Sequence, residues 1–89
     1  MGVIAEAIRR KLEAALTPER LEIVDDSDKH AGHSGHREGG ESHFTLTVVS
    51  DVFKGVGRVE RQRRINALLA EELAGPVHAL SIRAAAPGE

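Results

Sequence analysis

The stretch HFTLTVV (residues 43–49) decides the fold. Phe44, Leu46 and Val48 alternate with threonines, and β-branched residues make up most of the run. In a strand, successive side chains point to opposite faces, and β-branched residues fit a pleated surface. The stretch therefore predicts a strand with one apolar face.

A helix and a further strand are predicted after this stretch. Apolar residues recur at helical spacing between Val59 and Leu73, and Gly75-Pro76 ends the run. VHALSIR (residues 77–83) then alternates again and would place His78 on the same face as the apolar residues of the strand. Two successive strands joined by a helix favour a parallel pair with a right-handed crossover.

The N-terminal part predicts a helix and a third strand. Isoleucine and leucine recur every four residues from Ile4 to Leu16, and Pro18 stops the helix. Leu21 to Val24 is a short strand candidate, and Ser50 to Gly57 is a turn or a short helical piece. The predicted fold is a two-layer α/β sandwich, with three strands and the helices packed on one side.

The length and composition of the chain limit the kinds of protein and of site that it can form. With 89 residues, of which 40% are hydrophobic, the chain is expected to form a single domain over residues 1–89. It contains no cysteine, which excludes disulfides, thiolate metal sites and a cysteine nucleophile within the chain. The charged first eleven residues hold no apolar run long enough for a signal peptide or a membrane span, so we expect a cytoplasmic protein without a membrane partner.

A basic cluster lies at the start of the second long helix, beside Gly55 and Gly57. Its members are Lys54, Arg58, Arg61, Arg63 and Arg64. A basic helix beside a glycine turn can bind phosphate, whereas glutamates on the same helix favour an ordinary solvated surface or a protein contact. The net charge of −2 and the presence of only two aromatic residues make nucleic acid the minority interpretation.

Histidines supply the other candidate chemistry. HAGHSGHREGG (residues 30–40) carries His30, His33 and His36 among four glycines, which predicts a flexible loop over residues 27–40. The three imidazoles could converge on a metal only after ordering, and the loop lacks a scaffold to orient them. His43 opens a strand and is interpreted as a structural hydrogen-bonding residue, whereas His78 could project from the rim of the sheet.

Several blocks of the chain together resemble the BolA family. They are LEIVDDSDKHAGH (residues 21–33), ESHFTLTVVSDVFKG (residues 41–55) and RINALLAEELAGPVHALSIRA (residues 64–84). The match runs in order from about Ile4 to Pro87. The resemblance implies an αββααβ fold of the class II KH-like type with a mixed sheet.

The resemblance also implies a function. BolA-like proteins are non-enzymatic partners of monothiol glutaredoxins, and the two share a bridging [2Fe-2S] cluster that is not required for folding. Glutaredoxin supplies a cysteine and glutathione, and the BolA side supplies histidines, which fall here on His78 and His30. His33 is the first substitute for His30, and His36 is a second one. Alone, the protein is expected to be a monomer or weak homodimer.

The resemblance leaves a second function open. Some BolA proteins are transcription regulators, so the alternative is DNA binding through the basic cluster at the start of the helix. Gln62, between Arg61 and Arg63, replaces a histidine that is common in the family, so no imidazole can act at this position.

Overall fold

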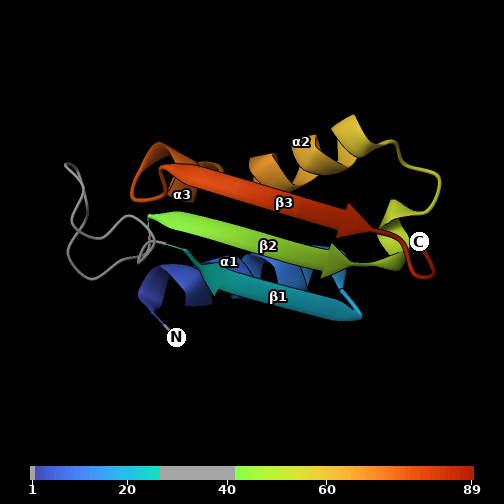
Figure 1. Cartoon of the computed structure of the whole chain (residues 1–89), viewed down its shortest axis with the longest axis horizontal. Coiled ribbons are helices and arrows are strands. Elements are labelled where there is room, and N and C mark those ends of the chain that lie inside the picture. Colours follow the sequence, from blue (N-terminus) through green and yellow to red (C-terminus); the bar gives the residue numbers. More distant parts are fainter. Residues whose placement is uncertain (1, 27–41) are drawn as a thin grey trace.

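The computed structural model describes residues 2–26 and 42–89 (Figure 1). Its elements are α1 (Val3–Leu16), β1 (Arg20–Asp25), β2 (His43–Val49), the 3₁₀ turn η2 (Asp51–Phe53), α2 (Arg58–Leu68), α3 (Ala70–Ala74) and β3 (Ala79–Ala85). This order confirms the predicted αββααβ arrangement. None of the helices in the described ranges is long and apolar enough to cross a membrane.

The three strands form one mixed sheet in the order β1-β2-β3. β1 pairs antiparallel with β2, and β2 pairs in parallel with β3, as the helical crossover predicted. In the parallel register His43 lies opposite Ala79, and Leu46 lies opposite Ile82. The starts of β2 and β3 therefore lie side by side at one rim of the sheet.

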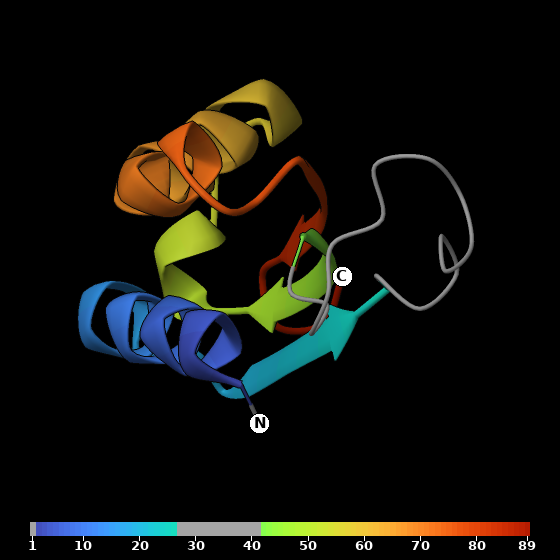
Figure 2. The same ribbon diagram turned by 90° about the vertical axis from the view of Figure 1, so that its left-hand side faces the viewer.

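All three helices cover the same face of the sheet (Figure 2). β2 shows why, because its burial alternates strictly and Phe44, Leu46 and Val48 are all buried. These residues pack with Ile8 and Leu12 of α1 and with further apolar residues of α2 and the adjoining strands. One apolar face per strand leaves the opposite face to solvent, which confirms the predicted two-layer sandwich.

Helix α1 ends where Pro18 predicts, and polar contacts hold its end in place. Thr17 caps it in the left-handed region, with φ of 42°. The buried hydroxyl of Ser50 donates to the carbonyl of Leu16 at 2.5 Å, and Lys11 binds the carboxylate of Glu72 on α3 at 2.8 Å. The first helix is thus tied both to the end of β2 and to the last helix.

The structure corrects two sequence-based boundaries. The predicted helix from Val59 to Leu73 is divided at Leu69, whose ψ of 21° departs from helical geometry while its side chain enters the core. The last strand begins at Ala79 rather than Val77. His78 therefore precedes the strand and is exposed, instead of sharing the half-buried face of Leu80.

Candidate functional site

His78 combines a fixed backbone with an exposed side chain. It follows the Gly75-Pro76 turn directly before β3. Its N–H donates to the carbonyl oxygen of Ser42 at 2.7 Å, and the N–H of Ala79 donates to the same oxygen at 3.2 Å. Because these bonds hold the main chain, the imidazole is presented to solvent from a defined point on the rim.

A second imidazole lies beside it. The rings of His43 and His78 are nearly parallel, at 14°, with centroids 6.2 Å apart. The ring of His43 is oriented by a 3.0 Å hydrogen bond between its Nδ1 and the hydroxyl of buried Ser42. The structure supports the structural role predicted for His43, and it adds the closeness to His78, which sequence reasoning missed.

The segment that carries the loop histidines is anchored at the same rim. The N–H of Asp26 donates to the carbonyl of His43 at 2.7 Å, and the carboxylate of Asp26 accepts a short hydrogen bond from the hydroxyl of Thr45. Asp26 and Ser42 are the last described residues on either side of that segment. His30, His33 and His36 lie outside the described residues, as does the predicted loop over 27–40, so their part in a metal site stays a prediction.

The donors at this rim fit part of a metal site. Within residues 2–26 and 42–89, no three His, Cys, Asp or Glu side chains gather closely enough to hold a metal ion. Two neighbouring imidazoles are suitable nitrogen ligands for iron or zinc, but such metals need further ligands. The rim can therefore contribute to a site that is completed by other groups, including sulfur that this chain lacks.

The predicted basic cluster is not a set of five free surface cations. Lys54 pairs with Asp51 at 3.4 Å, and Arg64 pairs with Glu60 at 3.4 Å, so two of its charges have acidic neighbours. Arg58 and Arg63 are exposed. Arg61, by contrast, is only 7% exposed and lies inside the fold.

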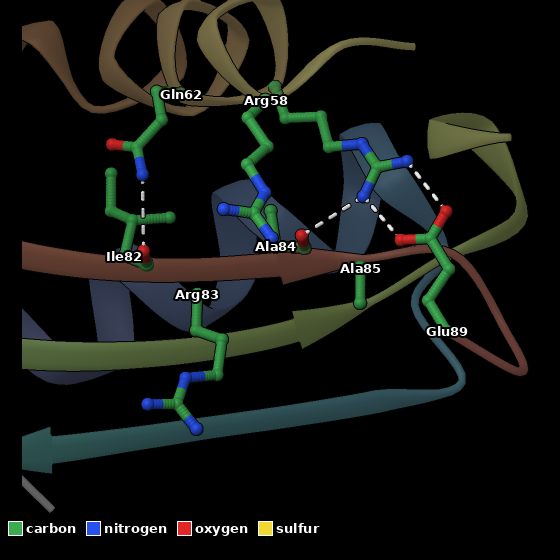
Figure 3. Close-up of a pocket in the computed structure, with 8 residues that line it drawn as sticks. Arg58, Gln62, Ile82, Arg83, Ala84, Ala85 and Glu89 are labelled. Carbon is green, nitrogen blue, oxygen red and sulfur yellow. Dashed lines mark hydrogen bonds and ion pairs between the residues drawn. The ribbon is translucent and has the colours of Figure 1, made fainter. Parts of the chain in front are cut away.

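Arg61 joins four parts of the chain. Its guanidinium donates to the carbonyls of Phe53, Val56 and Ala84 at 2.7 to 3.2 Å and lies 5.8 Å from the centre of the Phe53 ring. It also makes a bidentate ion pair with Glu89 (Figure 3). The hydrogen bonds of this pair lower the pKa of Glu89 to about 2. Arg61 thus serves the structure, and the sequence holds no signal that pairs it with Glu89.

Comparison with known proteins places the chain in a family. A family model described as BolA-like protein matches residues 12–89. The human BolA-like protein 1 is 47% identical over 89 residues, which are 100% of this chain but 62% of that protein, so this chain spans less than two thirds of it. The DNA-binding transcriptional regulator BolA of Vibrio cholerae is 42% identical over 80 residues, which cover 90% of this chain and 72% of the regulator.

A solved structure agrees with the sequence relatives. The BolA domain of SufE1 from Arabidopsis thaliana matches with a TM-score of 0.86 and 47% identity, covering 98% of this chain and 95% of that one. Both the fold and the sequence therefore identify this chain as a member of the BolA-like protein family.

Proposed function

We propose that this protein is a non-enzymatic iron–sulfur adaptor that shares a [2Fe-2S] cluster with a monothiol glutaredoxin. The observation that carries the proposal is the exposed imidazole of His78, held by two backbone hydrogen bonds beside His43 at the rim where the segment with His30 is anchored. The partner, the cluster and a cytoplasmic location are all part of this proposal, and the resemblance to the BolA family is what suggests the partner and the cluster.

The number of ligands that a [2Fe-2S] cluster requires favours a cluster shared between two proteins. A [2Fe-2S] cluster takes four ligands, and histidines can replace thiolates on one of its irons. His78 and His30 would supply two nitrogens, and His33 would be the substitute for His30. Glutaredoxin cysteine and glutathione would supply the two sulfurs, which a chain without cysteine cannot provide. When bound, the cluster offers a redox and transfer centre, while the residues of this chain hold one side of it.

A non-enzymatic role agrees with the described side chains. The hydroxyl of Ser42 is buried and bound to His43, and the hydroxyl of Ser50 is buried and donates to Leu16. Although the Ser42 hydroxyl lies beside an imidazole, both hydroxyls are buried and neither is presented to a substrate, as nucleophilic catalysis requires. The rim is therefore better suited to binding a metal centre than to catalysis.

Coexpression with a monothiol glutaredoxin tests the proposal. Visible absorption and circular dichroism of the purified complex should show a mixed-ligand cluster in the wild type and no cluster in His78→Ala. His30→Ala should weaken or shift the spectrum, and His33→Ala should change it little. A spectrum that survives His78→Ala unchanged would reject the cluster model, whereas loss in His33→Ala instead of His30→Ala would reassign the loop ligand.

DNA binding is the second candidate, favoured by the name of the Vibrio cholerae relative and by the exposed arginines Arg58 and Arg63. It is weakened by the burial of Arg61 and by the ion pairs of Lys54 and Arg64. If DNA binds here, Arg58→Ala with Arg63→Ala should lower its affinity and reduce its salt dependence. Absence of binding to duplex DNA at low ionic strength would remove this candidate.

A further inference from the structure

A groove of about 440 Å³ lies between the N-terminal half of α2 and the C-terminal half of β3 (Figure 3). Ala84 and Ala85 of β3 are among its lining residues, and their small side chains leave room beside the strand. The groove lies toward the end of β3, whereas His78 precedes its start, and seven strand residues span roughly 20 Å. It is therefore separate from the proposed cluster site, and both could be occupied at once.

The backbone edge of β3 is already engaged at this groove. Gln62 donates to the carbonyl of Ile82 at 3.2 Å, and Arg61 donates to the carbonyl of Ala84 at 3.2 Å. Side chains of α2 therefore occupy the outward carbonyls that an added strand would need. A ligand in the groove would be recognised by side-chain charge rather than by strand pairing.

The charges of the groove are unbalanced. Three arginines line it against a single acidic residue, Glu89. Glu89 is ion-paired with Arg61. Arg58 and Arg83 form no ion pair with any residue in the described part of the chain. In Figure 3, Arg58 reaches from α2 toward Ala84, and Arg83 extends from β3 in the direction away from α2.

The groove already binds one carboxylate. Glu89 accepts from two guanidinium nitrogens of Arg61, at 2.5 and 2.8 Å, and from the N–H of Ala86 at 3.1 Å. Arg58, which also attracts the Glu89 carboxylate electrostatically, and Arg83 offer the same fork-shaped donors, and neither has an ion pair within residues 2–26 and 42–89. Because successive side chains of an extended peptide point to opposite sides, neighbouring acidic residues could reach both arginines.

We propose that the groove between α2 and β3 is a docking surface for an acidic, extended segment of a partner protein, whose adjacent carboxylates pair with Arg58 and Arg83. A peptide is favoured over nucleic acid because base stacking requires exposed aromatic rings. The chain has no tryptophan or tyrosine, and Phe44 and Phe53 are buried. The proposal goes beyond the cluster-binding function and does not depend on it.

Fluorescence anisotropy with a labelled peptide of alternating aspartate and glutamate tests this surface. The protein should bind this peptide and not its asparagine–glutamine counterpart. Arg58→Glu with Arg83→Glu should weaken binding about tenfold or more, with binding also falling as salt rises. Arg63→Glu is the matched control, because Arg63 is exposed on the same helix but does not line the groove, and it should change the affinity less than about twofold.

Three outcomes would overturn the proposal: no binding of the acidic peptide by the wild type, an equal loss in Arg63→Glu, or tighter binding of duplex DNA with the same dependence on Arg58 and Arg83. The last would assign the groove to nucleic acid. Far-UV circular dichroism verifies that each variant is folded. If the double charge reversal unfolds the protein, Arg58→Gln with Arg83→Gln replaces it, with Arg63→Gln as the control.

Discussion

Leu46 offers the sharpest test of the two-layer arrangement. It lies in the central strand, fully buried, between Ile23 of β1 and Ile82 of β3 in the register of the sheet. Neighbouring strands on both sides limit how far the structure can collapse around a deleted side chain. Leu46→Ala should therefore cost about 3 kcal/mol, within the range of about 2–5 kcal/mol for leucine-to-alanine changes in protein cores.

The expected cost is large for a domain of this size. At about 0.05–0.15 kcal/mol per residue, 89 residues give a total stability of roughly 4–13 kcal/mol. An entropy of unfolding of about 2.1 cal/mol/K per residue converts the loss of Leu46 into a drop in Tm of roughly 15 °C. In urea, with a slope of about 1–1.5 kcal/mol/M, the midpoint should fall by about 2–3 M.

Thr47 is the matched control, because it is the next residue of β2 and the alternating burial of the strand places it on the face opposite Leu46. Thr47→Ala should cost less than about 1 kcal/mol, since it buries little apolar surface. Both variants are measured by urea unfolding followed by circular dichroism. Equal losses in Leu46→Ala and Thr47→Ala would refute the assignment of a single covered face to the sheet.

Three other expectations follow from particular contacts. Glu89→Gln should lower the urea midpoint at neutral pH, and the gap to wild type should close as the pH falls from about 4.5 to about 2, because the folded-state pKa of Glu89 is lowered to about 2 and such a carboxyl stabilises only while ionised. Glu72→Gln should destabilise the protein more than Glu71→Gln in thermal unfolding, since both bind Lys11 but the Glu72 side chain is 10% exposed and the Glu71 side chain 87%. Thr17→Gly should raise the free energy of unfolding by about 0.5 kcal/mol in urea titrations, because φ of 42° strains a β-branched residue, and an unchanged midpoint would contradict that strain.

Periodicity predicted most of the fold because each element buries one face. The alternation of Phe44, Leu46 and Val48 located β2, and the helix between two strands gave their parallel pairing. The boundaries near His78 were less accurate. Its alternation with Leu80 looked like a continuous strand, but the shared carbonyl of Ser42 holds the chain just before the first paired residue.

Contacts between distant side chains could not be predicted from the sequence. Arg61 looked like one of several surface cations, since nothing in its local pattern indicates that Phe53, Ala84 and Glu89 surround it. The closeness of His43 to His78 could in principle have been predicted from the sequence, because parallel pairing of the two strands implies it. Recognising it required the register as well as the direction of pairing.

The register of the sheet explains how His43 and His78 come to lie side by side at the rim. The pairing that buries Phe44 opposite Leu80 also places His43 opposite Ala79, directly after His78. A slip by one residue would turn His43 toward the helices and Phe44 toward solvent, which the apolar core opposes. Core packing therefore sets the backbone position of His43 beside His78, and the hydrogen bond to Ser42 orients the ring of His43. Under the proposed cluster model, we therefore expect substitutions between Asp26 and Ser42 to change which ligand joins His78 without moving His78 itself.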